Sequence, residues 1–271
     1  VSSGYLWSST DGGANWAAFT SAGTKFWYGV TSSEDFIKLA ATVVSGSVYS
    51  SSDGGSSWIA IGNAAASWRG ITSNADLSKI AACVYDGTLQ HTANNNGAGF
   101  ETWSTFANAG SKNWKDITSN RDFTKFAAVV EDGLMYLSRD SGLTWASQGN
   151  TANRKWNFIT ADADFTRFVG TVSITAAAAG NVLLSVDDGT SWSIMPGTGS
   201  QDFRGIANDA NFTVFSSTVF GSTIYHSAPA GGTWVTNTMG AQITSVGATS
   251  IVSCGAGTYS VSGRPSCTSC S

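Results

Sequence analysis

The segment WRGITSNADLSK (Trp68–Lys79) recurs with the same length as WKDITSNRDFTK (Trp114–Lys125). Three further copies open with an aromatic residue, at Trp27, Trp156 and Phe203. A phrase that returns several times within one chain indicates a repeat architecture, in which each unit buries its apolar face against its neighbours. The fold is therefore expected to be a set of similar units rather than a single irregular domain.

A second phrase, here called the box, closes each unit. It reads SSDGGSSW in Ser51–Trp58, and further copies end at Trp16, Trp145 and Trp192. Altered copies end at Trp103 and Trp234, so that the six closing tryptophans are separated by 42, 45, 42, 47 and 42 residues. This period matches a propeller blade of four short strands.

One period contains the signals of four strands. β-Branched and aromatic residues fill 114–118, 125–130 and 134–138, and a fourth run begins at Thr144. Glycine, asparagine and aspartate fill the gaps, where tight turns need them. Each period therefore predicts an antiparallel blade with three turns.

Both ends of the chain contribute partial units. Val1–Asp11 aligns with Val43–Asp53, and Ile243-Thr244-Ser245 repeats Ile71-Thr72-Ser73. We therefore expect an all-β, six-bladed propeller over residues 1–253, with the ring closed by strands from both termini. Closure would cover two edge strands that otherwise invite aggregation. A fragment of a longer array, with five blades and two halves, remains the alternative.

The box resembles a known motif. The pattern Ser-x-Asp-x-Gly-x-(Ser/Thr)-Trp resembles the Asp-box, or bacterial neuraminidase repeat, which in its family forms a hairpin between the third and fourth strands of a blade. The residues suit that task themselves, because aspartate can accept hydrogen bonds from turn amides, glycine can adopt positive φ and tryptophan can fill the gap between blades. The box is interpreted as a folding device, with these residues: Asp11, Trp16, Asp53, Trp58, Asp140, Trp145, Asp187 and Trp192.

Charge and hydropathy exclude several classes of function. Only 12% of the residues are charged, 14 basic residues face 18 acidic ones, and no run of like charge occurs, so nucleic acid is not an expected partner. No apolar stretch reaches the length of roughly 18 residues that a membrane-spanning helix needs. The chain starts at Val1 without a basic segment followed by an apolar run, so any signal peptide is expected to have been removed.

The cysteines divide into two groups. Cys83 lies in an apolar run and is expected to be a buried strand residue. Residues 254–271 form a cysteine-rich tail that looks like the start of an ephrin-receptor-like extracellular repeat. That resemblance implies a disulfide between Cys254 and Cys267 and leaves Cys270 for a downstream residue or another subunit. No histidine lies near them, which makes a metal site the weaker reading. Asn211 opens a sequon and is a candidate N-glycosylation site.

The chain has few of the residues that glycosidase active sites use. A sialidase-like site would need three arginines, a tyrosine activated by a glutamate, and an aspartate, and most glycosidases need two facing carboxylates. The only glutamates are Glu34, Glu101 and Glu131; the last two are expected in turns between outer strands, and Glu34 at a solvated repeat position. We therefore expect no catalytic residue, no metal and no cofactor.

One ring of residues is a candidate binding site. The position after each opening aromatic is occupied by Tyr28, Arg69, Lys115, Asn157 and Arg204. If the first strand is innermost, these side chains could converge at one mouth of the channel and hold an anionic or hydroxyl-rich ligand. They could equally cap strand starts and pair with Asp116 or Asp202.

Together these features predict a secreted, non-enzymatic β-propeller that serves as a structural or adhesive building block at a cell surface or in an extracellular assembly. Its expected partners are other copies of itself or other extracellular proteins. The alternative is a glycan-binding or glycan-cleaving propeller that uses Arg69, Lys115 and Arg204.

Overall fold

The computed structural model describes residues 3–11, 15–61, 65–93, 102–148, 154–173, 180–209 and 211–219, and the short strands 224–227, 234–236, 241–242, 252–253, 258–260 and 267–269. Its regular structure is β-strand, apart from two single 3-10 turns, η1 (Thr20–Ala22) and η2 (Ala107–Ala109). No helix in this described part is long and apolar enough to span a membrane.

Within the described residues, five antiparallel blades of four strands follow one another along the chain. Blade one consists of β3 (Trp27–Ser32), β4 (Leu39–Gly46), β5 (Val48–Ser51) and β6 (Ile59–Ala60). Blade two consists of β7 (Ala66–Ser73), β8 (Lys79–Val84), β9 (Leu89–Ala93) and β10 (Ser104–Thr105). Blade three consists of β11 (Trp114–Ser119), β12 (Phe126–Gly133), β13 (Met135–Ser138) and β14 (Ala146–Ser147). Blade four consists of β15 (Arg154–Ala161), β16 (Phe168–Val172), β17 (Asn181–Ser185) and β18 (Ser193–Ile194). Blade five consists of β19 (Phe203–Asn208), β20 (Phe215–Val219), β21 (Ile224–Ser227) and β22 (Trp234–Thr236).

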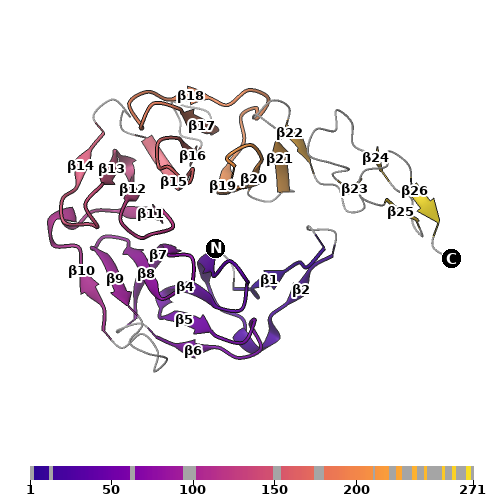
Figure 1. Ribbon diagram of the computed structural model, residues 1–271, viewed down its shortest axis with the longest axis horizontal. Coiled ribbons are helices and arrows are strands. Elements are labelled where there is room, and N and C mark those ends of the chain that lie inside the picture. The colour runs from indigo at the N-terminus through magenta and orange to yellow at the C-terminus, as the bar shows by residue number, and fades with distance from the viewer. Residues whose placement is uncertain are drawn as a thin grey trace.

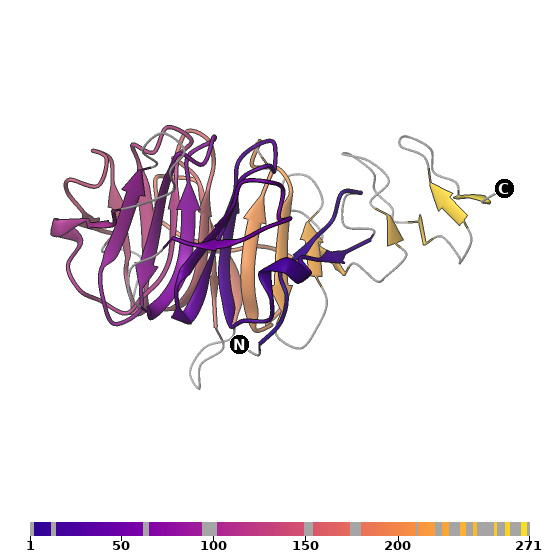
Figure 2. The ribbon, with the colours of Figure 1, turned by 90° about the horizontal axis from the view of Figure 1, so that it is seen from below.

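The blades are arranged around a common centre, with first strands such as β7, β11, β15 and β19 innermost and fourth strands such as β10, β14 and β18 at the rim (Figure 1). Seen from the side, their strands run side by side across one layer (Figure 2). Short pairings also connect neighbouring blades, from β4 to β7 and from β12 to β15. The all-β, propeller-like architecture predicted from the repeat is thereby confirmed.

The core is divided among the boundaries between blades. Each of the four boundaries holds its own apolar cluster, built from the second and third strands of one blade and the first strand and turn of the next. The opening aromatics at the centre of these clusters are at most 1% exposed; they are Trp68, Trp114, Trp156 and Phe203. Burial of each such side chain contributes about 1.5–3 kcal/mol, so the repeated aromatic is a packing residue.

The turn between the first and second strands inserts a second large residue into each cluster. Leu77, Phe123, Phe165 and Phe212 occupy this position, all with positive φ and none more than 7% exposed. Large residues rarely adopt positive φ, and the conformation persists here because the surrounding boundary buries the side chain.

The two chain ends form small sheets of their own. β1 (Trp7–Ser8) pairs with β2 (Ala17–Ala18), and β23 (Ala241–Gln242) pairs with β24 (Val252–Ser253). Among the described residues no strand pairing joins these two sheets to each other or to blade five. The predicted closure of a sixth blade by strands from both termini therefore stays a prediction.

The cysteine predictions have different outcomes. Cys83 is fully buried and free, as expected for a strand residue, and burial raises the pKa of its thiol well above the usual value. The tail contains β25 (Thr258–Ser260) and β26 (Cys267–Ser269). Cys254 and Cys270 lie outside the described residues, as does the side chain of Cys267, so the disulfide and the boundary at residue 254 stay predictions. Asn211 is exposed between β19 and β20, where a sequon is accessible.

Candidate functional site

The boxes are hairpin loops between third and fourth strands. In the box of blade one, Asp53 Oδ1 accepts hydrogen bonds from the Ser57 amide at 2.9 Å and from Ser51 Oγ at 2.8 Å. Gly55 has a φ of 89°, and its carbonyl accepts a bond from Trp58 Nε1 at 3.2 Å. Hydrogen bonds to the side chain and amide of Ser57 lower the pKa of Asp53 to about 2.

The same amide contact recurs at 2.9 Å in the other boxes, from Asn15, Thr144 and Ser191 to Asp11, Asp140 and Asp187. The closing tryptophans Trp145 and Trp192 pack against the clusters between blades. Every polar group of the boxes named here is used within the loop, which is the arrangement expected of a folding device.

Near the centre of the ring, in the region predicted to be the channel mouth, Arg69 lies between two tyrosine rings. Its guanidinium carbon is 5.0 Å from the ring centre of Tyr28 and 5.1 Å from that of Tyr85. The Tyr28 ring also stacks on Phe158 of blade four, with ring centres 5.5 Å apart and an angle of 20° between the planes. Two side chains from blades one and four therefore meet across the centre of the ring.

Lys115 continues this series of contacts. Its Nζ lies 5.5 Å from the ring centre of Tyr85 and 3.3 Å from a carboxylate oxygen of Glu131. Burial lowers the pKa of Lys115, and this effect outweighs the negative charge of Glu131, which raises it. The positive charges of Arg69 and Arg204 lower the pKa further. Burial would raise the pKa of Glu131, but hydrogen bonding with Tyr85 and the charge of Lys115 hold it below its usual value.

The remaining two members of the predicted ring are bound locally. Arg204 Nη2 pairs with Asp202 at 2.6 Å, which is one of the pairings anticipated from sequence. Asn157 Nδ2 donates to Ser173 Oγ and to the carbonyl of Phe203, both at 2.7 Å. The structure thus brings Tyr28, Arg69 and Lys115 into one contact series, places Arg204 within electrostatic range of Lys115, and uses Asn157 to join blades four and five.

Asp116 has a different role from the one considered in the sequence. It is 6% exposed and accepts a hydrogen bond at Oδ2 from the Ile159 amide at 2.9 Å, which joins blades three and four. Its ring-mouth neighbour Gly70 packs so closely that a Cβ there would lie 1.8 Å from Asp116 Oδ1, so only glycine fits. Burial raises the pKa of Asp116 to about 8.

Sequence reasoning missed Tyr85 and misplaced Glu131. Glu131 was expected in a turn between outer strands, but it lies within β12 and reaches the mouth. Both residues directly follow the valine that pairs with an opening tryptophan, Val84 opposite Trp68 and Val130 opposite Trp114. This strand register was the only feature from which the positions of Tyr85 and Glu131 near Arg69 and Lys115 could have been predicted. Glu34 is exposed, as expected, and pairs with Arg121.

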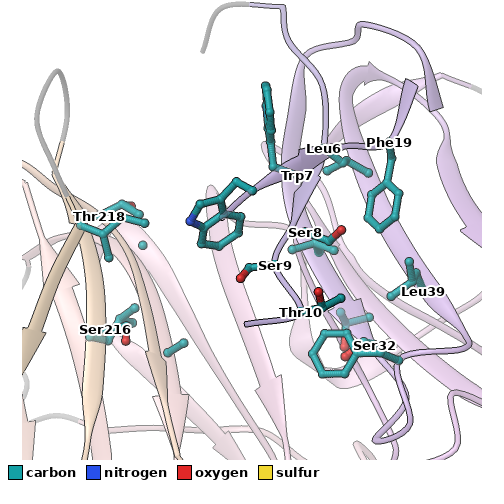
Figure 3. A pocket seen from close by; sticks show the side chains of 18 of the residues that line it. Leu6, Trp7, Ser8, Ser9, Thr10, Phe19, Ser32, Leu39, Ser216 and Thr218 are labelled. Atoms are coloured by element: carbon teal, nitrogen blue, oxygen red, sulfur yellow. The ribbon is translucent and has the colours of Figure 1, made fainter. Parts of the chain in front are cut away.

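A large apolar cavity lies between the two ends of the ring. Its volume is about 820 Å³, and it lies between β1 and β3 on one side and β19 and β20 on the other. Figure 3 shows Trp7, Phe19 and Leu39 opposite Ser216 and Thr218 across this space. We call it the slot. No group of three or more His, Cys, Asp or Glu side chains that could hold a metal occurs among the described residues.

The wall that blade one presents to the slot is built like a buried boundary. Phe36 occupies the same turn position as the buried Phe165, yet it is 68% exposed. Val30 occupies the position of Ile71 and Ile117 and is 61% exposed, against 7% and 2% for those residues. Side chains that are core residues at the four other boundaries thus face open space at this one.

Comparison with known proteins supports the fold alone. No family model and no curated protein matches the chain. Among solved structures, the nidogen/laminin complex matches with a TM-score of 0.63 at 13% identity, over 78% of this chain and 79% of that one. YCF48 bound to D1 peptide matches with a TM-score of 0.55 at 14% identity, over 84% and 69%.

Glycoside hydrolases are also among the similar structures. The GH74 xyloglucanase from Xanthomonas campestris matches with a TM-score of 0.57 at 18% identity, over 86% of this chain. The chain spans only 39% of the length of that enzyme and 31% of the GH74 enzyme from Niastella koreensis. The chain therefore has a β-propeller-like fold, which is found in enzymes and in other proteins alike.

Proposed function

We propose that this protein is a non-enzymatic building block of an extracellular or cell-surface assembly, and that it contacts other copies of itself through an incomplete terminal blade. The observation that carries this proposal is the slot, with Phe36 and Val30 exposed although the residues at the same positions of blades two to four are buried. An apolar surface of this kind is typical of a protein–protein contact.

The proposed ring has six blades. β1 and β2 supply the third and fourth strands of the sixth blade, because Trp7 pairs with Ala18 just as Tyr49 pairs with Ala60, 42 residues further along. The box geometry likewise supports membership of the Asp-box propellers. Two inner strands would then complete the blade and fill the slot.

The channel mouth supports a non-enzymatic function. Lys115 forms an ion pair with Glu131, and Arg204 forms one with Asp202. The guanidinium group of Arg69 lies against two tyrosine rings. These contacts hold neighbouring blades together, and they leave the two clearest cations already paired.

Light scattering and electron microscopy of the full chain, with and without reductant, test the proposal. We expect filaments or larger oligomers, and dissolution by reductant would assign Cys270 to the contact between copies. A chain that stays monomeric at all accessible concentrations would contradict the proposal.

A glycan-binding propeller is the second candidate. The observation that favours it is Arg69 Nε, which is buried and has no hydrogen-bond partner within the described part of the chain. On a glycan array, the double variant Arg69→Ala, Arg204→Ala is expected to behave like the unchanged protein if the mouth is structural. Loss of a glycan signal in this variant, with its fold intact by circular dichroism, would replace the first candidate with the second.

A further inference from the structure

The slot has the shape of a missing strand pair. In every complete blade the third strand pairs with the second, but β1 pairs only with β2 in the part of the chain that the structure describes. Trp7 and Ser8 of β1 line the slot, which lies where the first and second strands of a sixth blade would be. A free strand edge beside an apolar wall is a site for added strands.

Neighbouring first strands are joined by a hydroxyl contact that indicates what the slot accepts. Thr31 Oγ1 of blade one lies 2.8 Å from Ser73 Oγ of blade two, and Thr72 Oγ1 lies 3.0 Å from Ser119 Oγ of blade three. At both of these boundaries the threonine comes from the earlier blade and the serine from the next one along the chain; at the boundary between blades four and five, Thr160 meets Asn208 instead. Blade one presents its own serine, Ser32, to the slot, so the incoming strand should offer a threonine there.

The chain contains a hairpin with this pattern. Ile243-Thr244-Ser245 repeats the Ile71-Thr72-Ser73 segment of a first strand, and Ile251 is followed by two small or β-branched residues, as Ile80 is. β23 and β24 are antiparallel, and Gln242 pairs with Val252 ten residues later. In blade two, Ile71 pairs with Ala82 and Thr72 with Ala81, so the matching pairs here would be Ile243 with Ser253 and Thr244 with Val252, two residues from the observed register. The segment thus resembles the first two strands of a blade in its sequence and its antiparallel pairing, and its register would shift by two residues within a blade.

The connection to this hairpin is shorter than its equivalents. Each closing tryptophan is followed by the first strand of the next blade, in which Ile71 and its equivalents hold one fixed position. The distance from the tryptophan to that position is 14, 13, 14, 14 and 14 residues along the chain, whereas it is 9 residues from Trp234 to Ile243. Short hinge loops disfavour folding back onto the same chain and promote exchange of the element between copies. In Figure 1, β23 and β24 lie outside the ring of blades, beyond β22.

We propose that the slot is filled by residues 241–253 of a second copy of the chain, which complete the sixth blade in trans. This inference rests on the proposed building-block function and names its contact. Donor hairpin and slot are different surfaces, so the contact is heterologous, and each copy can both give and receive a hairpin. Thr244 of the donor would then lie against Ser32 of the acceptor.

Cysteine cross-linking between two different chains tests this contact. Full-length chains with the three tail cysteines changed to serine are produced together, one carrying Ser32→Cys and the other a size tag and Thr244→Cys. A disulfide between these cysteines requires two copies. The matched control is Thr31→Cys with Ser73→Cys in one chain, because these hydroxyls lie 2.8 Å apart across an observed blade boundary.

We expect a reductant-sensitive heterodimer band from the mixed chains, and a ladder of oligomers when Ser32→Cys and Thr244→Cys are placed in one chain. A monomer with an internal cross-link and no heterodimer would overturn the proposal, because the hairpin then enters its own ring. Absence of any cross-link while the control reacts would overturn it as well. Oligomers seen by light scattering without this cross-link would leave the building-block function standing and remove only the strand exchange.

Discussion

Asp116→Asn is expected to remove a large fall in stability between pH 4 and pH 8. Burial raises the pKa of Asp116 to about 8 in the folded protein, whereas an aspartate in an unfolded chain has a pKa of about 3.9. Between these values the unfolded chain has lost the proton that the folded chain retains, so stability falls as pH rises. At about 1.4 kcal/mol per unit, the loss is on the order of 5 kcal/mol, and above pH 8 the curve is flat.

Asparagine keeps an oxygen that can accept the hydrogen bond from the Ile159 amide, and it does not ionise. Urea unfolding of both proteins at pH 5 and pH 8 should therefore show a variant that is more stable by only about 1.5 kcal/mol at the lower pH and by several times that amount at the higher pH. Asp76→Asn is the control, since hydrogen bonding with Ser78 lowers the pKa of Asp76 and keeps it ionised throughout this range. Parallel curves for the unchanged protein and Asp116→Asn would show that Asp116 titrates normally.

The architecture could be read from the sequence because the repeat determines it. Each copy supplies an opening aromatic and a box, and residues such as Trp156 and Asp187 perform in the structure the tasks that their residue types allow. The hydrogen bonds of the box are local, spanning four residues or fewer, so they need no knowledge of distant parts of the chain.

The candidate site could be read only in part. Tyr28, Arg69 and Lys115 were placed together because they share a repeat position, but their partners Tyr85 and Glu131 come from the ends of second strands. The pairing of these side chains depends on the register between the first and second strands, in which Trp114 lies opposite Val130, 16 residues later. It also depends on a bulge next to the opening tryptophan. Sequence patterns do not determine such a bulge.

The slot was hidden from the sequence for a different reason. Phe36 follows the repeat as closely as Phe165 does, and the pattern predicts the same burial for both. Exposure of Phe36 depends on what occupies the next position in the ring, which is a property of the assembly of blades and not of the repeat itself.

These two phenylalanines therefore provide a matched pair of variants. Phe165 is fully buried and its ring stands at 85° to Phe168, with ring centres 5.3 Å apart. Phe165→Ala should destabilise the fold by about 3–5 kcal/mol, because it leaves a cavity at the boundary between blades three and four. Phe36→Ala in a dilute, monomeric sample should cost less than about 1 kcal/mol, since the ring already contacts water.

The two variants should also differ in their effect on assembly. Phe165→Ala lowers the stability of each copy, whereas Phe36→Ala should leave the copies folded and shift assembly to higher protein concentration, because it weakens the wall against which a donor hairpin packs. Chemical denaturation of dilute samples, followed by light scattering over a concentration series, measures the two effects separately. If Phe36→Ala destabilises the monomer as strongly as Phe165→Ala, the sixth blade is already complete within one chain, and strands from another copy are not needed to bury its wall.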